Sequence, residues 1–350
     1  MKNKLTERWK SDGLWKQKWE TVMKCFLGEN KFEKLDKSYY LENGYLDLRG
    51  FDFGQRVDFK EYSDKDYSEL SLKSLGVIRG IDFVNVDFSY ADFSGRSINN
   101  CKFNNCIFNY SNFRGILEQQ CEFFNCNFYK GTFGGFLGCG ESLYKNVIFD
   151  GVNMKDTWMN LPNFEDCIFE NCKLKEVHFK GSHFRRVKFN GKVAEIVLQP
   201  KTEEPTSSIY YKSKYERWNA VNPMMIDFSE AELMDIRVWG ECDFSNVILP
   251  ADGNGYIVFN VAKAKKVIEE FRDNNQTSEK FFNRLLKFGF YCAPQGTKVK
   301  ILGLGDISLY MEEITDEEER QLALDNWMRL RDELLSKNLM TNKSNATWNH

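Results

Sequence analysis

The chain has 350 residues, of which 42% are apolar, so it can bury a sizeable core and general disorder is excluded. Its 48 basic and 51 acidic residues leave a net charge of −3, which is typical of neither a nucleic-acid-binding protein nor an acidic tail. No apolar run is long enough to cross a membrane, and the first residues, MKNKLTERWK, lack the apolar stretch of a secretory signal.

The first predicted element is an amphipathic helix over residues 4–27. Trp15, Trp19, Val22 and Phe26 recur at helical spacing and would share one apolar face. Residues 1–44 are therefore expected to form a helical cap over the repeats that follow, because the end of a repeat array has to be shielded from water.

The central feature of the sequence is a repeat with a period of five residues. Large apolar residues, the repeat centres, recur at every fifth position in two registers, a period that fits neither a helix nor a strand. Glu118 interrupts the first register. The centres are Phe83, Phe88, Phe93, Ile98, Phe103, Phe108, Phe113, Phe123, Phe128 and Phe133, then Phe149, Met154, Met159, Phe164, Phe169, Leu174, Phe179, Phe184 and Phe189. A small or apolar side chain such as Cys101 commonly stands two places before a centre, and Asp or Asn often stands directly before it.

This pattern resembles the pentapeptide repeat family, whose units read A(D/N)LXX, and the stretches VDFSYADFSG and VNMKD match it closely. The resemblance covers roughly residues 45–250 and implies a right-handed quadrilateral β-helix with four units in each coil. The expected fold class is thus an all-β core with α additions, namely this β-helix, an N-terminal helix and a helical C-terminal region. Residues 20 apart should stack at the inter-strand spacing, which would place Phe108 between Phe88 and Phe128.

Two stretches interrupt the predicted β-helix, near residues 134–146 and 194–225. Insertions of this kind map to loops on one side of a repeat array. Ile148 and Ile168 each precede a centre and should point outward, so they are expected to be covered by a loop or by a partner.

The region 256–350 changes to a helical pattern. One helix is predicted around Val261 to Phe271, and a second is predicted to start at the cap Ser278 and to end at Gly289. A third is predicted to begin with a capping box formed by Thr315 and Glu318, with an apolar face formed by Ala323, Trp327, Leu330 and Leu334.

Nothing in the sequence predicts catalysis, a cofactor or a metal site. His178 and His183 are five residues apart and would lie on adjacent faces of a square coil, where they make a poor chelate. The cysteine pairs with C-x4-C spacing, such as Cys101 and Cys106, fall on the small inward site and are read as buried structural thiols. Ten cysteines without an export signal also favour reduced thiols and a cytoplasmic location, in what we expect to be a bacterial protein.

The charges weigh against one function that the resemblance suggests. The best-known members of the family protect type II topoisomerases such as gyrase with an acidic surface that imitates DNA. Here residues 46–190 hold 18 basic and 19 acidic residues, a net charge of −1 (18 − 19). Residues 172–192 are even basic, and their side chains are candidate partner contacts: Lys173, Lys175, Lys180, Arg185, Arg186, Lys188 and Lys192.

The favoured hypothesis is a non-catalytic scaffold that binds another protein, of which an inhibitor or an immunity-type protein would be one kind. No membrane and no direct nucleic-acid partner are expected. Two alternatives remain open. One is the DNA-mimicking topoisomerase protection protein, and the other is an enzyme activity within the C-terminal region, because a fold shared by many functions does not choose among them.

Overall fold

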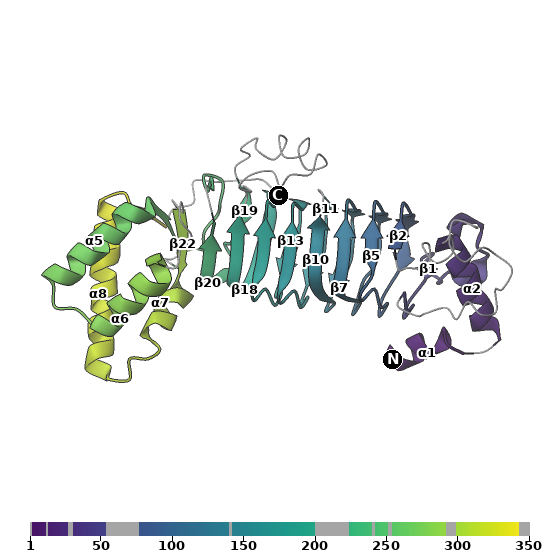
Figure 1. Cartoon of the computed structure of the whole chain (residues 1–350), viewed down its shortest axis with the longest axis horizontal. Coiled ribbons are helices and arrows are strands. Elements are labelled where there is room, and N and C mark those ends of the chain that lie inside the picture. The colour runs from purple at the N-terminus through teal and green to yellow at the C-terminus, as the bar shows by residue number, and fades with distance from the viewer. Residues whose placement is uncertain are drawn as a thin grey trace. The chain divides into compact units, whose positions relative to one another are not determined.

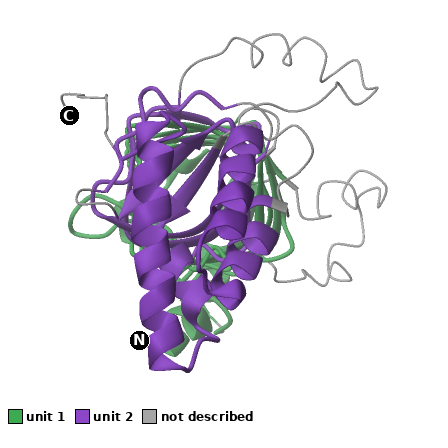
Figure 2. Ribbon diagram, turned by 90° about the vertical axis from the view of Figure 1, so that its left-hand side faces the viewer, with its two compact units in different colours: residues 1–173 green, residues 174–350 purple. Residues whose placement is uncertain are grey.

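The computed structural model describes most of the chain in two compact units, residues 1–173 and residues 174–350 (Figure 2). The described residues are 2–11, 13–26, 31–53, 77–139, 142–199, 224–239, 242–250, 254–291 and 299–342. Most of the second predicted insert, the C-terminal His350 and residues 54–76 lie outside them.

The first unit begins with helices and continues as short strands. The helices are α1 (Lys2–Arg8), α2 (Leu14–Phe26), η1 (Phe32–Lys34) and η2 (Lys37–Tyr39). The strands are β1 (Leu46–Asp47), β2 (Val77–Arg79), β3 (Asp82–Val84), β4 (Val86–Asp87), β5 (Ser97–Asn99), β6 (Lys102–Asn104), β7 (Asn112–Gln119), β8 (Glu122–Phe124), β9 (Asn127–Tyr129), β10 (Thr132–Cys139), β11 (Leu143–Lys145), β12 (Ile148–Asp150), β13 (Thr157–Asn160), β14 (Asn163–Glu165) and β15 (Ile168–Glu170).

These strands line the faces of the predicted right-handed quadrilateral β-helix. Strands β2, β5, β7, β10 and β13 pair in parallel in that order on one face (Figure 1). Strands β3, β6, β8, β11 and β14 form a second face, and β9, β12 and β15 lie on a third. The fourth face is formed by isolated β-bridges between adjacent coils, such as Asp92 with Asn112 and Asn153 with Lys173.

The phenylalanine centres stack as the repeat predicts. Phe108 lies between Phe88, at a ring-centroid distance of 5.1 Å, and Phe128, at 4.5 Å, with the rings nearly parallel. The neighbouring columns, Phe93 with Phe113 and Phe83 with Phe103, stack at 4.6 and 4.9 Å. Each column buries apolar surface continuously from coil to coil, which is the main stabilising contribution in such a fold.

The backbone conformation at the corners of the coils explains why Asn and Gly recur two places after a centre. The second residue after a centre adopts a left-handed backbone conformation at successive corners, as at Asn85 (φ 54°), Asn105 (φ 54°) and Gly95 (φ 66°). Asparagine and glycine tolerate this conformation better than other residues, so their recurrence there follows from the turn.

The inward cysteines are buried thiols, as predicted. Cys101 and Cys121 are fully buried and free, and each donates a hydrogen bond to the carbonyl oxygen of a residue in the preceding coil, Ile78 and Ile98 respectively, at 3.6 Å. Burial raises the pKa of the Cys167 and Cys172 thiols to about 12, so these thiols stay protonated at neutral pH.

The stretch 134–146 continues the β-helix in its described part. β10 pairs with β7 and β13, and Tyr144 takes a centre position between Phe123 and Phe164, with ring-centroid distances of 4.9 and 5.1 Å. The repeat therefore slips by one residue here, because Phe123 and Tyr144 are 21 apart instead of 20.

Glu118, the polar residue at a centre, is buried with its own hydrogen-bond donors. Ser142 Oγ donates to one carboxylate oxygen and Tyr144 OH donates to the other at 2.8 Å. The backbone N–H of Cys121 also donates to Glu118, at 3.2 Å. A buried carboxylate is tolerable only when it is hydrogen-bonded in this way.

The prediction of a single helix over residues 4–27 is wrong. The structure has two helices there, α1 and α2, because Ser11 and Gly13 interrupt the helical run. The predicted cap contact is present. Phe26 of α2 packs against Phe83 of the coil at 5.8 Å, and Val22 is fully buried. Arg8 of α1 donates two hydrogen bonds to Asp47, at 2.7 and 2.8 Å, and stacks on Trp15.

Acid is expected to weaken this N-terminal cap through Asp47. Burial by itself would raise the pKa of Asp47, but hydrogen bonds from Arg8 and Arg49 outweigh it and hold the pKa far below its usual range. Because the pKa of Asp47 is lower in the folded state, its ionised carboxylate stabilises the fold at pH values above the unfolded-state pKa of about 4. That stabilisation is lost as the pH falls through the folded-state pKa. Asp47→Asn should therefore be less stable than wild type at pH 7, and the gap in melting temperature should narrow between pH 5 and about pH 2. A gap that stays constant over this range would contradict the assignment.

The second unit contains further coils and an α/β region. Its elements are β16 (Val177–Lys180), β17 (His183–Arg185), β18 (Val187–Gln199), β19 (Ile226–Asp227), β20 (Ala231–Val238), β21 (Gly255–Phe259), α5 (Val261–Asn274), α6 (Glu279–Arg284), the π-helix η4 (Leu285–Tyr291), β22 (Val299–Gly303), α7 (Leu304–Met311), α8 (Glu317–Ser336) and β23 (Met340–Thr341). β16 and β20 flank β18 in parallel. No helix among the described residues is long and apolar enough to cross a membrane.

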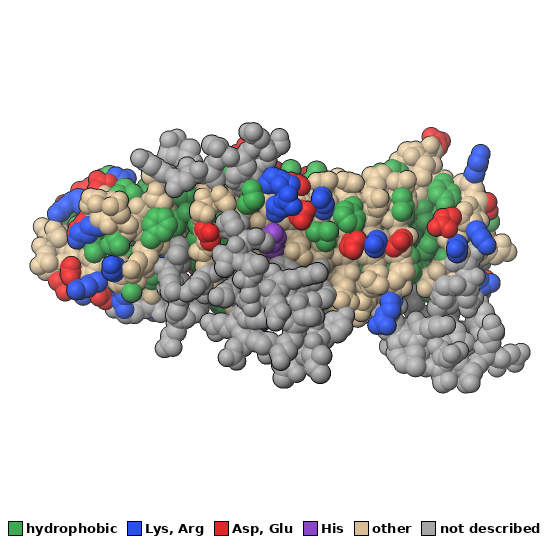
Figure 3. All heavy atoms as spheres, turned by 90° about the horizontal axis from the view of Figure 1, so that it is seen from above, with side chains coloured by type: hydrophobic (Ala, Val, Ile, Leu, Met, Phe, Trp, Pro, Cys, Tyr) green, Lys and Arg blue, Asp and Glu red, His purple; other side chains and the backbone are tan. Residues whose placement is uncertain are grey.

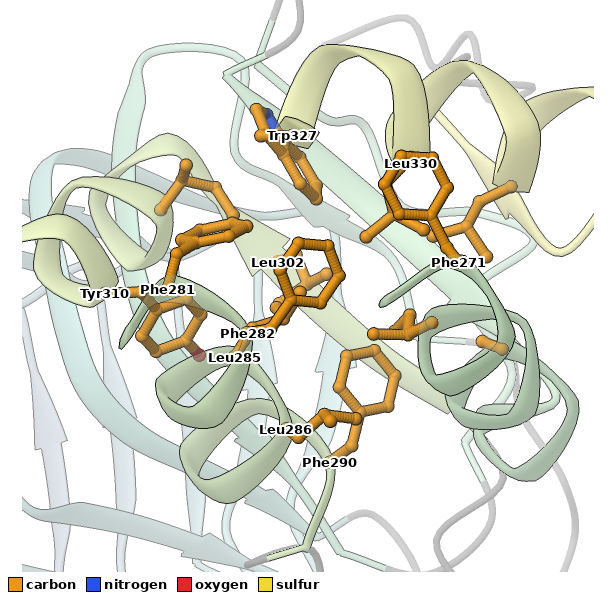
Figure 4. Close-up of a cluster of buried hydrophobic side chains, with 14 of the residues drawn as sticks. Phe271, Phe281, Phe282, Leu285, Leu286, Phe290, Leu302, Tyr310, Trp327 and Leu330 are labelled. Carbon is orange, nitrogen blue, oxygen red and sulfur yellow. The ribbon is translucent and has the colours of Figure 1, made fainter. Parts of the chain in front are cut away.

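The C-terminal region contains the predicted helices and, in addition, a small antiparallel sheet. β21 pairs with β22 and with β23, and α5, α6 and α8 bury Phe271, Phe282 and Trp327 beside it (Figure 4). Ser278 caps α6 as predicted, but the helical run passes Gly289 as a π-helix. The predicted Thr315 cap is wrong by one residue, because the side chain of Asp316 accepts the hydrogen bond from Glu319 N.

Candidate functional site

The seven basic residues of 172–192 lie at outward positions of the coils, and acidic partners stand beside Lys175 and Lys188. Lys175 forms an ion pair with Glu195 at 3.2 Å, and Lys188 forms one with Glu230 at 2.9 Å. Lys173 in the first unit and Lys192 in the second are exposed, and Lys180 and Arg186 are half-buried. Arg185 ends β17 with an exposed side chain.

His178 belongs to a network of polar side chains on β16 and β20 of the second unit. Arg237 donates to both oxygens of Glu176, at 3.2 and 3.3 Å, and to Asp235 at 3.0 Å. Burial lowers the pKa of His178, although the Glu176 carboxylate opposes the shift. Trp239 packs edge-on against the imidazole at 5.5 Å. These contacts fit a structural role, and within the described ranges no three His, Cys, Asp or Glu side chains cluster as metal ligands.

Charged side chains elsewhere on the first unit form pairs between adjacent coils. Lys102 of β6 pairs with Glu122 of β8 at 3.4 Å, and Lys145 of β11 pairs with Glu165 of β14 at 3.2 Å. Such exposed pairs add little stability. On the face seen in Figure 3, lysine and arginine side chains are interspersed with aspartate and glutamate, so this face does not carry the continuous acidic surface that a DNA mimic needs.

The face formed by β5, residues 116–119 of β7, residues 135–139 of β10, and β13 differs, because no charged side chain points outward from these segments. Leu117, Phe136 and Trp158 occupy one column on adjacent strands, in register. Phe136 is 54% exposed and Trp158 is 43% exposed, whereas Leu117 is half-buried. We call these three residues the apolar strip.

Neutral amides stand beside the apolar strip on β5, β7 and β13, and β10 contributes Cys139 opposite Gln119. Asn99 and Gln119 pair in register, and the side-chain amide of Asn99 donates to that of Gln119 at 3.3 Å. Asn160 ends β13 at the corresponding position. Glu118, the one carboxylate in these strand segments, points into the core. The face therefore combines exposed aromatic side chains with uncharged polar ones, which is the composition of the centre of a protein interface.

Sequence reasoning missed the apolar strip, although it did place apolar residues outward on another face. Ile148 and Ile168 pair in register on β12 and β15, and Ile148 is 41% exposed. Phe136 follows the five-residue register of neither repeat block, since its partners Leu117 and Trp158 are 19 and 22 residues away. The available signal was the pair Phe136 and Leu137 after two glycines, because in a strand one of two consecutive apolar side chains has to point outward.

The comparisons with known proteins agree with the repeat. The pentapeptide repeats family model matches residues 87–116 and 162–191, with eight copies. A full-length structure of QnrB1, a plasmid-mediated fluoroquinolone resistance protein, is 13% identical, with a TM-score of 0.20, and the match covers 46% of this chain and 84% of that one. HetL, a pentapeptide repeat protein involved in heterocyst differentiation regulation from the cyanobacterium Nostoc sp. strain PCC 7120, is 13% identical, with a TM-score of 0.23, and the match covers 50% and 85%.

No curated protein sequence matches the chain. The repeat assignment accordingly depends on the eight matched copies and on the stacked, four-sided coils that the repeats build. Residues 87–116 and 162–191 are therefore pentapeptide repeats, and the coils that they help to build form a pentapeptide repeat β-helix.

Proposed function

We propose that this protein is a non-catalytic scaffold that binds another protein through the apolar strip. The observation that carries the proposal is the exposure of Phe136 and Trp158 side by side on a face without outward charge. Large aromatic side chains at the surface supply most of the binding energy in protein interfaces, and charged residues are depleted at the centres of those interfaces. An exposed apolar patch of this kind on a rigid sheet favours a protein partner over a small molecule.

The absence of enzyme activity is part of the proposal. The buried polar groups of the described coils, such as Glu118 and its donors, are enclosed in the core where no substrate reaches them. Half-buried carboxylates such as Glu122 and Glu165 are engaged with lysines of the adjacent coil. An inhibitor or immunity-type protein is the kind of scaffold we favour, since such proteins act through a preformed surface. The free, buried thiols support a cytoplasmic location.

Lysine substitutions in the apolar strip are expected to abolish partner capture. Phe136→Lys and Trp158→Lys would place an unpaired charge in the centre of the interface, which costs several kcal/mol when the charge is desolvated. The measurement is affinity capture from the native host with tagged full-length protein, followed by mass spectrometry. The control is Asn104→Lys, at an exposed position that follows a centre on the second face. If all three variants captured the partner equally well, the interface would not include the apolar strip.

We further propose that the basic residues of 172–192 attract an acidic partner at long range. Charges outside the centre of an interface change the association rate more than the dissociation rate, and salt screens their effect. Lys180→Glu combined with Lys192→Glu, both in the second unit, should slow association by roughly threefold to tenfold at low salt and leave dissociation unchanged. Surface plasmon resonance with the captured partner, at low and at about 0.5 M salt, measures both rates. Identical association rates for wild type and variant at low salt would exclude this role.

A further inference from the structure

The chemistry of the apolar strip limits what kind of element can cover it, and this inference depends on the proposed function. Every strand of the face is paired on both sides in the interval from β5 to β13: β5 between β2 and β7, β7 between β5 and β10, and β10 between β7 and β13. Their backbone N–H and C=O groups are therefore used in hydrogen bonds between adjacent coils. A partner segment cannot add itself as a further strand, because such addition needs a free strand edge.

The covering element must then satisfy its own backbone hydrogen bonds. An extended segment laid on this face would lose water from N–H and C=O groups without gaining partners, at a cost for each group. An α-helix forms all its backbone hydrogen bonds internally and offers only side chains. Helices commonly cover the apolar face of a sheet for this reason.

The dimensions of the face also fit one helix. Strand segments of three or four residues give it a width of about 10–13 Å, and a helix with its side chains is about 10–12 Å across. Four strands about 4.8 Å apart extend for about 14 Å, so the face is on the order of 200 Å² in projection. Specific protein interfaces bury about 800 Å² from each partner, so this face can form only the centre of an interface, where one helix fits its width and length.

The charges around the face indicate which helix fits. Because no outward charge stands on the face itself, a charged side chain in the contact would be desolvated without a counter-ion. At the corner within β7 that leads into residues 116–119, Arg114 is exposed, and at the corner that precedes β13 the exposed Lys155 lies 3.8 Å from Asp156. At the opposite end of the strands, Gln120 and Leu161 are uncharged. The best fit is a helix with an uncharged contact stripe and an acidic flank toward Arg114.

We propose that the apolar strip binds an amphipathic α-helix of a protein partner, which lies across β7, β10 and β13 with its apolar stripe on Leu117, Phe136 and Trp158. The spacing makes this specific. Successive strip residues are about 4.8 Å apart, which corresponds to about three residues of a helix at 1.5 Å rise but to one or two residues of an extended chain. From Leu117 to Trp158 the helix advances by about six or seven residues, and an extended chain by about three.

The test places a photo-crosslinking residue, p-benzoylphenylalanine, singly at positions 117, 136 and 158 of the full-length protein in its native host. The partner residues that each position labels are then mapped by mass spectrometry. The expected result is one partner segment in which the labelled residues advance by three or four from each strip position to the next. An advance of one or two, or labels scattered over separate segments, would overturn the helix and leave the protein-binding function standing. Absence of a discrete adduct at all three positions would overturn the proposed function itself.

A defined peptide completes the test. The labelled segment is synthesised together with a matched peptide that carries one central proline, which breaks a helix, and one that carries alanine at the same place. The proline peptide should bind wild-type protein at least about tenfold more weakly than the alanine peptide. The alanine peptide should bind Phe136→Lys about 30-fold more weakly than wild type, and Asn104→Lys as wild type. Equal affinities of the two peptides would refute the helical contact.

Discussion

Replacing Phe108 by alanine is expected to lower the free energy of unfolding by about 3–5 kcal/mol. Phe108 is fully buried and is stacked face to face with a ring of the coil on either side, at 5.1 and 4.5 Å. Removing the ring leaves a cavity with stacked rings above and below, and those rings are held by their own backbone strands, so the cavity cannot collapse. Urea melts followed by circular dichroism measure the effect.

The matched control for Phe108→Ala is Asn104→Ala in the same coil. Asn104 ends β6 with an exposed side chain, so its truncation should change the free energy of unfolding by about 0.5 kcal/mol or less. Equal losses in the two variants would show that the stacked column is not the source of stability. A change in the slope of the urea dependence would indicate partial unfolding instead of a uniform loss.

Replacing Gly303 by alanine is expected to have a comparably large effect on the second unit, at least about 3 kcal/mol. A Cβ at Gly303 would lie 1.9 Å from the carbonyl oxygen and 2.5 Å from the carbonyl carbon of Leu233. These are backbone atoms of β20 in the centre of a paired strand, so they cannot rotate away. The added methyl group therefore has to push β22 away from β20.

That displacement would also break the hydrogen bonds that Asp306 makes between the two elements. Its carboxylate accepts from Gly303 N and from Asp235 N, each at 2.8 Å, and it is buried. The control is Gly289→Ala in the π-helix, where a Cβ would meet its nearest neighbours at an ordinary 3.5 Å. Differential scanning calorimetry should show a large drop in melting temperature for Gly303→Ala only. Similar melting temperatures for both variants would contradict the tight contact between β20 and β22.

Much of the first unit could be predicted from the repeat, because its contacts join residues at fixed spacings along the sequence. Each centre packs against centres five and twenty residues away, so a single period defines both the corner and the stack. The inward position of Cys101 followed in the same way. The offset between the two registers indicated the slip, but the sequence did not show Tyr144 as a centre stacked on Phe123, because the stretch 134–146 lacks the repeat pattern.

The C-terminal region was less predictable because its sheet joins distant segments. β21 and β22 are separated by α5, α6 and the π-helix, and β23 follows α8 at the end of the described chain. Helical periodicity predicted α5 and the buried face of α8 correctly, including Ala323 and Leu334. β21 and β22 have five residues each and β23 has two, which is too few for the period of a strand to be recognised in the sequence. Pairing between strands that lie far apart along the chain depends on the whole core.

The sequence by itself determined the repeat and the inward residues, and its resemblance to the pentapeptide repeat family implied the square coil. The tertiary structure alone decided which outward residues meet. Phe136 and Trp158 come together only because β10 and β13 are neighbours in adjacent coils, with a spacing that the five-residue period does not contain. It likewise decided that Glu118 is tolerated in the core, because Ser142 and Tyr144 lie within hydrogen-bonding reach only after the next coil has closed over it. The physical reason is the same in both cases: burial is imposed by a local pattern, whereas the partner of a side chain depends on how successive coils align.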